Sequence, residues 1–243
     1  MATGTVSTQV AHEGSRRRWL RRFANGLIAL GIVVILYAGV ILAWGDPVTW
    51  VWAHYQQRQL ESQFNGYDEF AITPTPQDNG TDILADVRRE AAAFKAHDPN
   101  GHAFGRLSIG RIGLSNVVVV QGTDRYGDLD KGPGHYDNTN FPGQGSTVAI
   151  AGHRTTFGAW FRHIDEIRDG DYIILQMPYA TFRYQVQMHK VVTNTDWSII
   201  KPPGYERLVL SACHPIYSAS HRYIIFARAI SVTLPGDGGS YTL

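Results

Sequence analysis

Residues 207–232 read RLVLSACHPIYSASHRYIIFARAISV, two apolar runs separated by a short polar segment. β-Branched and aromatic residues favour strands, and Pro215 ends the first run because proline cannot donate to a sheet ladder. A turn over residues 215–221 would return the second run beside the first as a hairpin. Runs of this kind begin at Gly105, so the sequence predicts a β-rich domain from there onward.

Five similar runs precede this hairpin, each interrupted by Gly, Pro, Asp or Asn. No regular alternation with helices lies between them, which argues against a βαβ fold. The predicted strands span residues 106–112, 116–121, 146–151, 172–176, 181–192, 207–212 and 223–232. We expect a mostly β fold of about eight strands, an antiparallel closed barrel or a sandwich, with a helical turn within residues 157–167.

The N-terminal part has the composition of a membrane anchor. Phe23 to Trp44 is an uncharged apolar run, long enough as a helix to cross the roughly 30 Å hydrocarbon core of a bilayer. Five arginines lie within residues 16–22, and such a cluster stays on the cytoplasmic side. A cleaved signal peptide is the alternative, but its apolar region is usually only about 7–15 residues long. We predict a single-pass protein of the cell membrane with a cytoplasmic N-terminus, in which Trp44, Trp50 and Trp52 form an interfacial aromatic belt on the far side.

Four segments are predicted along the 243 residues. They are a basic cytoplasmic tail (1–22), a transmembrane helix (23–44), an extracytoplasmic linker with short helices (45–100) and a β-barrel domain (101–243). Hydrophobic residues make up 44% and charged residues 18% of the chain, as in an ordinary globular protein. The formal net charge of +1 creates no global field that would favour nucleic acid as a partner.

The chain contains one cysteine, Cys213, which therefore cannot form an intramolecular disulfide. Such a thiol is either buried and inert or used in chemistry. Cys213 stands at the end of a predicted strand, where a rigid scaffold can present a nucleophile. An ordinary thiol, with a pKa of about 8.5, is only a few per cent ionised at neutral pH. A reactive Cys213 therefore needs a base or a cation nearby.

Three residues are candidates for that role. His214 is adjacent in sequence, but successive side chains of an extended segment point to opposite faces. His153 ends another apolar strand, where Gly152 allows close approach of the backbone. Arg222 begins the strand after the hairpin and would lie near Cys213. Its guanidinium suits a substrate carbonyl or an oxyanion, although a solvated cation at a strand edge is the alternative.

Taken together, these motifs resemble the catalytic motifs of the sortase family in their usual order. They are GHRT at 152–155, LxxCHP at 210–215 and RxI at 222–224. The segments GPGHY at 132–136, FPGQ at 141–144 and AGHRTT at 151–156 further resemble class E sortases of high-GC Gram-positive bacteria. The resemblance covers residues 106–232. One departure is Ala212, where the family usually carries threonine before its cysteine.

The resemblance implies a closed sortase-like β-barrel and a cysteine transpeptidase that needs no cofactor. Sortases cleave the Thr–Gly bond of an LPxTG-like sorting signal, or an LAxTG-type signal in class E, and form a thioacyl enzyme. The acyl group then passes to an amine of the peptidoglycan precursor or of a pilin lysine. By this match Cys213 is the nucleophile and His153 is the proton donor and acceptor. By the same match Arg222 binds the sorting signal and stabilises the oxyanion. The implied partners are secreted proteins with LAxTG-like signals, met at the cytoplasmic membrane.

Other residues receive secondary assignments. We assign substrate binding to Tyr136, Ala212 and His214, with a core role as the alternative for Tyr136. Four acidic residues have the loop spacing of Ca²⁺ ligands, but turn chemistry explains them as well, and no metal site is predicted. These residues are Asp124, Asp128, Asp130 and Asp137. A cysteine hydrolase and a non-catalytic envelope binding module remain as alternative functions.

Overall fold

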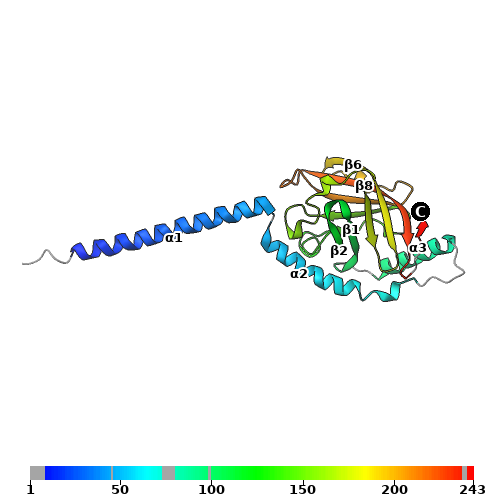
Figure 1. Cartoon of the computed structure of the whole chain (residues 1–243), viewed down its shortest axis with the longest axis horizontal. Coiled ribbons are helices and arrows are strands. Elements are labelled where there is room, and N and C mark those ends of the chain that lie inside the picture. Colours follow the sequence, from blue (N-terminus) through cyan, green and yellow to red (C-terminus); the bar gives the residue numbers. More distant parts are fainter. Residues whose placement is uncertain (1–8, 45, 73–79, 98–99, 237–239) are drawn as a thin grey trace, which may run out of the picture. The chain divides into compact units, whose positions relative to one another are not determined.

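The computed structural model describes residues 9–44, 46–72, 80–97, 100–236 and 240–243. The chain divides into two compact units, Met1–Gly45 and Asp46–Leu243. The first unit carries the helix α1 (Gln9–Trp44), coloured blue in Figure 1. Its segment Arg17–Ile41 is the one helix of the described residues that is long and apolar enough to cross a membrane. The predicted transmembrane segment, residues 23–44, therefore overlaps a candidate membrane span over residues 23–41.

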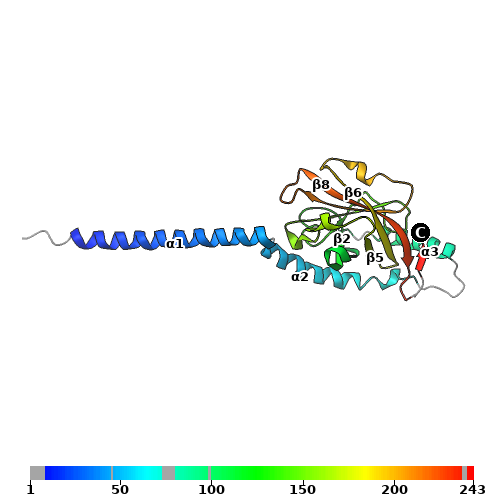
Figure 2. The same cartoon turned by 45° about the horizontal axis from the view of Figure 1, so that its top comes forward.

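The second unit is a closed β-barrel with short helices (Figures 1 and 2). Its strands are β1 (Ala103–Ile109), β2 (Leu114–Gln121), β3 (Gly134–His135), β4 (Thr147–Gly152), β5 (Tyr172–Gln176), β6 (Thr181–Thr193), β7 (Arg207–His214), β8 (His221–Thr233) and β9 (Ser240–Thr242). The barrel order is β6-β5-β1-β2-β3-β4-β7-β8, β6 pairs with β8 to close it, and β9 extends from β8. All seven predicted strands are confirmed. The very short β3 and β9 carry no strand pattern and were not predicted.

The expectation of a purely antiparallel sheet is wrong at two places. β3 runs parallel to β2, and β4 runs parallel to β7. The chain passes through β5 and β6 between β4 and β7, so the connection is long enough to bring the strands together in the same direction. As a result both strands end at the same edge of the barrel, with Gly152 paired to Ala212.

The two faces of β7 pack into different apolar clusters. Leu208, Leu210 and Ala212 belong to the main core inside the barrel. Val209 belongs to a second cluster, which also includes Ile199 of the 3₁₀ turn η5 (Trp197–Ile200). Because side chains alternate along a strand, Cys213 projects on the same side as Val209. The thiol therefore lies outside the barrel core.

Two helices of the second unit pack on the barrel. α2 (Pro47–Phe64) starts with proline at its first position, and the Asp46 carboxylate accepts hydrogen bonds from the first turn. Its Leu60 and Phe64 pack on β2, beside which α2 runs in both views. α3 (Gly80–Ala96) buries one apolar face in the main core. The predicted linker thus supplies helices that cover the barrel, whereas its Pro-rich part at 73–79 lies outside the described residues.

Short 3₁₀ turns complete the unit. They are η1 (Asp68–Phe70), η2 (Gly110–Ile112), η3 (Phe157–Ala159) and η4 (Ile164–Glu166), in addition to η5. The predicted helical turn within residues 157–167 is confirmed as η3 and η4. These two turns lie in the loop that follows β4, and His153 is the first residue of that loop.

Candidate active site

Strand pairing brings Cys213, Arg222 and His153 to one edge of the barrel. Cys213 and Arg222 are directly opposite each other in the antiparallel pair β7–β8, so their side chains share a face. The parallel pair β4–β7 ends at Gly152 and Ala212, so that His153 and Cys213 follow on neighbouring strands. All three residues line one pocket of about 290 Å³. The hairpin and the meeting of strand ends expected from the sequence are confirmed.

The pocket is completed by the loop before β3 and by the ends of β4 and β7. Its other lining residues are Thr123, Arg125, Leu129, Tyr136, Ala151, Gly152, Ser211, Ala212 and Ala219. Tyr136 also packs against the second apolar cluster, so its ring is both a wall of the pocket and a packing group. Both roles considered for Tyr136 are therefore compatible with its position.

The other two residues assigned to substrate binding are placed differently. Ala212 borders the pocket, but it is buried in the main core. His214 lies outside the pocket lining, and its ring contacts the Tyr223 ring at 5.8 Å between centroids. Strand alternation puts both residues on the face opposite to Cys213. The expectation that His214 is badly placed to activate the neighbouring thiol agrees with this arrangement.

His153 is half-buried. Its Nε2 is shielded from solvent and has no hydrogen-bond partner among the described residues. Burial lowers the pKa of His153 below its ordinary value of 6.5, and the positive charge of Arg125 lowers it further. Asp130 acts in the opposite direction. At neutral pH the imidazole is therefore mostly neutral.

Arg222 is fixed by its own turn. Its Nη1 donates to the backbone carbonyls of Ala219 and His221, each at 3.0 Å. Within the described part of the chain these are its hydrogen bonds, and they use one nitrogen of the guanidinium. Nε and Nη2 remain as donors for a substrate oxygen.

Gly152 sets the path of the backbone into His153. A Cβ atom at this position would lie 2.5 Å from a ring carbon of Phe161. The Phe161 amide donates to the His153 carbonyl at 3.0 Å, so the loop folds back tightly on its own beginning. The close approach expected at Gly152 is confirmed, because a side chain there would displace Phe161.

Arg154 is a buried cation that the sequence analysis did not assign to the site. Its side chain is only 4% exposed, and it forms an ion pair with Asp165 at 2.6 Å. It also donates to the Arg162 carbonyl and, at 3.4 Å, to the carbonyl of Cys213. Arg154 therefore ties the end of β7 to the loop that carries His153. Its only signal in the sequence is its place within the GHRT motif.

Ser211 was also missed. It is 1% exposed, lines the pocket and lies on the same face of β7 as Cys213. Its hydroxyl has no hydrogen-bond partner among the described residues. A small polar residue within a strand carries no signal that distinguishes such a position from an ordinary one.

The loop after His153 holds three consecutive residues in the left-handed region. Phe157, Gly158 and Ala159 have φ angles of 50°, 80° and 46°. For the two non-glycine residues this costs of order 1–3 kcal/mol each, so other contacts must hold the loop. Helix α2 supplies them: Thr49 Oγ1 accepts a hydrogen bond from the Phe157 amide at 2.9 Å, and the His54 ring lies 4.9 Å from the Trp160 ring.

The acidic loop has the character of a turn. Asp128 accepts a hydrogen bond from the Asp124 amide at 3.0 Å, and Asp130 accepts one from the Gly127 amide at 2.9 Å. These contacts agree with turn chemistry as the explanation of Asp128 and Asp130. Among the described residues no group of three potential ligands is arranged to hold a metal ion.

Comparison with known proteins agrees with this geometry. Residues 107–230 match the Sortase domain family. The chain is 34% identical over 209 residues to sortase D of Bacillus subtilis strain 168, a match that covers 84% of this chain and 96% of that protein. The solved structure of sortase E from Streptomyces avermitilis is 34% identical, with a TM-score of 0.51 over 58% of this chain and 95% of that one.

A further solved structure shares the fold. The Clostridium perfringens sortase D5 transpeptidase is 21% identical, with a TM-score of 0.58 over 72% of this chain and 99% of that one. The Sortase domain match and the sortase homologues define the protein as a cysteine transpeptidase. The chain belongs to the sortase family. Its relatives include class D and class E members alike, so the resemblance to class E stays a prediction.

Proposed function

We propose that this sortase joins the threonine carboxyl of an LAxTG-like sorting signal to an amine of the cell wall precursor, using Cys213, His153 and Arg222. The observation that carries the proposal is the single pocket lined by all three residues. Cys213 is the only cysteine of the chain, so the nucleophile of a cysteine transpeptidase has one candidate. Sortases act on sorting-signal proteins and cell wall precursors in general, and for this chain we propose an LAxTG-like signal and an amine of the cell wall precursor.

The first half-reaction forms a thioester. The Cys213 thiolate attacks the carbonyl carbon of the signal's threonine, and negative charge develops on the carbonyl oxygen. The free donors of Arg222 stabilise this oxyanion. As the tetrahedral intermediate collapses, protonated His153 gives its proton to the nitrogen of the leaving glycine. The C–N bond breaks, and the acyl group remains on sulfur.

The second half-reaction transfers the acyl group. His153, now neutral, takes a proton from the incoming amine as its nitrogen attacks the thioester carbonyl. The C–S bond breaks, the thiolate is restored and the imidazole is charged again. Each half-reaction thus returns the proton that the other requires. No group beyond these three side chains and the two substrates is needed to balance the protons.

Tyr136 supports the assignment of an LAxTG-type signal. Its ring occupies the wall of the pocket next to the second apolar cluster. We propose that this ring fills space that the proline ring of an LPxTG signal would take, while the methyl group of alanine fits beside it. The segment around Tyr136 is also one of those that resemble class E sortases.

The proposed setting is the outer face of the cell membrane. The apolar helix and the arginine cluster at residues 16–22 support a single-pass protein with its N-terminus in the cytoplasm. The secreted substrate and a lipid-linked acceptor would then be confined to the same membrane face. Confinement raises their effective concentration at the pocket.

The experiment is a ligation assay with the full chain in detergent micelles. The enzyme is mixed with an LAxTG peptide and a small peptide that offers the amine of a peptidoglycan stem. We expect ligated product, detected by mass spectrometry, and slower ligation of a matched LPxTG peptide. Free threonine acid as the only product would contradict the proposed transfer. Product formed only with a pilin-type lysine peptide would move the acceptor from the cell wall to a pilin.

The pH dependence of ligation follows from the lowered pKa of His153. Because the resting imidazole is mostly neutral, the reacting thiolate–imidazolium pair is a minority form that arises when the thiol passes its proton to His153. Below the pKa of His153 the imidazole already holds a proton and cannot take that of the thiol, so activity falls there. We therefore expect the acid limb of kcat/KM below pH 6.5. Arg125→Gln removes a charge that lowers this pKa, so the limb should move upward by a fraction of a pH unit. Arg89→Gln, a surface change on α3, is the control and should leave the limb unchanged.

A further inference from the structure

We propose that an exposed apolar stripe on helix α2 lies in the interfacial region of the lipid bilayer and seats the barrel on the membrane surface. The stripe consists of Val48, Val51, Trp52 and Tyr55, and we call it the α2 stripe. The inference goes beyond catalysis and rests on the proposed membrane anchor. It concerns only residues of the second unit.

The spacing of the α2 stripe defines one face of the helix. Its members stand at positions i, i+3, i+4 and i+7, which lie above one another on an α-helix. Their exposed fractions are 66%, 62%, 47% and 56%. The barrel-facing side of the same helix is apolar too, with Ala53 and Leu60 buried. A surface helix in water should present polar residues to solvent, whereas the first two turns of α2 present apolar ones.

The apolar character is confined to the start of the helix. The same face continues as Arg58, Gln59 and Ser62, which are exposed and polar. Elsewhere on the described barrel, large exposed apolar residues such as Tyr126 and Trp197 occur singly in sequence. Isolated exposed apolar residues need no explanation, whereas a contiguous exposed set marks a contact surface.

The position of the α2 stripe along the chain indicates that lipid covers it. Seven residue steps separate Ile41, the end of the candidate span, from Val48. An extended chain reaches at most about 3.6 Å per residue, so the α2 stripe begins within about 25 Å of the end of the span. Trp and Tyr are the residues enriched where headgroups meet the hydrocarbon core. Arg58, at the polar end of the face, suits lipid phosphate.

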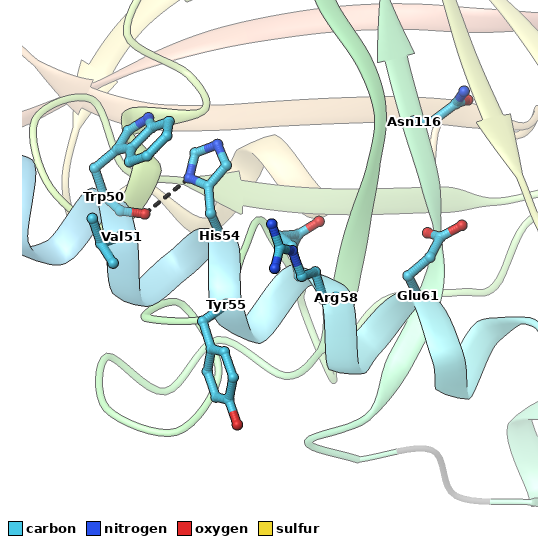
Figure 3. Close-up of a pocket in the computed structure, with 8 residues that line it drawn as sticks. Trp50, Val51, His54, Tyr55, Arg58, Glu61 and Asn116 are labelled. Carbon is cyan, nitrogen blue, oxygen red and sulfur yellow. Dashed lines mark hydrogen bonds between the residues drawn. The ribbon is translucent and has the colours of Figure 1, made fainter.

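A pocket beside the α2 stripe has matching chemistry. It has a volume of about 690 Å³ and is lined by Trp50, Val51 and Tyr55 at one end and by Arg58, Glu61 and Asn116 towards the other. In Figure 3 His54 and Tyr55 extend from opposite sides of the helix, His54 with its hydrogen bond to the Trp50 carbonyl and Tyr55 pointing away from it. The Glu61 carboxylate is already paired with Arg106. Apolar walls followed by the Arg58 cation therefore fit an amphipathic lipid rather than a free ion.

The test measures depth at single positions of the full chain in lipid nanodiscs. Cys213→Ala provides a background without thiols, into which Val51→Cys, Tyr55→Cys, Gln59→Cys and Tyr126→Cys are introduced one at a time and spin-labelled. Collision with oxygen, which concentrates in lipid, is compared with collision with a water-soluble nickel chelate. We expect the oxygen-to-nickel ratio to be severalfold higher at 51 and 55 than at 126, with 59 in between.

The outcomes separate this inference from the proposed anchor and from self-association. Equal ratios at 51, 55 and 126, in a chain that still co-elutes with nanodiscs, would overturn the α2 stripe as a lipid contact and leave the anchor standing. Failure to co-elute would overturn both. Dipolar broadening between labels at 55 that grows with protein density would assign the stripe to a second copy instead. Circular dichroism of each labelled chain confirms that the barrel is folded.

Discussion

The Cys213→Ala variant of the full chain should form neither a thioacyl enzyme nor ligated peptide. The sequence contains no second thiol, so no other side chain can carry the same covalent intermediate. Cys213 is partly exposed at the end of β7, and loss of one sulfur atom there removes little packing. We therefore expect a complete loss of activity with little change in stability. Intact-protein mass spectrometry after incubation with an LAxTG peptide detects the thioacyl enzyme, and the ligation assay detects the ligated peptide.

Cys213→Ser is the matched control for shape. It keeps a group of similar size that is far less nucleophilic at neutral pH, so it should also lack the thioacyl adduct. Its melting temperature should match that of the unsubstituted chain. Ligated product above the level without enzyme in the alanine variant would remove Cys213 from the proposed chemistry.

The His153→Gln variant should lose about 10²- to 10⁴-fold in kcat/KM, the usual contribution of a positioned acid and base. Glutamine preserves polarity and much of the size of the side chain, but it cannot exchange a proton. Both half-reactions need that exchange, so acylation and transfer should slow together. Single-turnover measurements of adduct formation and of its consumption by the amine would show both effects.

His163→Gln is the control for this second prediction. His163 lies outside the pocket on the surface, where it pairs with Glu166. The control should keep nearly full activity. Equal losses in the two variants would indicate a general effect of histidine removal and contradict the assigned role. The rate of Cys213 alkylation offers an independent check, because its pH dependence should change only when His153 is replaced.

The strands of the barrel could be predicted because each longer one has its own pattern of β-branched and aromatic residues. The direction of pairing could not, since propensity is a local property and says nothing of which neighbour a strand meets. β4 and β7 therefore emerged as a parallel pair where an antiparallel sheet was expected. The packing of α2 on the barrel could not be predicted either, because it depends on contacts between residues that are distant in the sequence. Leu60 and Val118 belong to one apolar cluster, although nearly sixty positions separate them in the sequence.

For the site, the positions of Cys213, His153 and Arg222 followed from motifs and from the hairpin between β7 and β8. Their environment did not. The lowered pKa of His153 depends on burial and on Arg125, which comes from a loop before β3. The role of Arg154 depends on Asp165 and on the carbonyl of Cys213, which meet only in the folded barrel. Such through-space partners leave no trace in a single sequence.

The hydrogen bond between Thr49 and the Phe157 amide has a practical consequence for the choice of material. A soluble fragment that begins after α2 keeps the strands and the cysteine, yet it removes the hydroxyl and the His54 ring that hold the left-handed residues 157–159. Without these contacts the backbone of residues 157–159 would relax toward ordinary dihedral angles, and this change would displace the His153 side chain. Turnover numbers from trimmed enzymes would then understate what the intact chain achieves in its membrane.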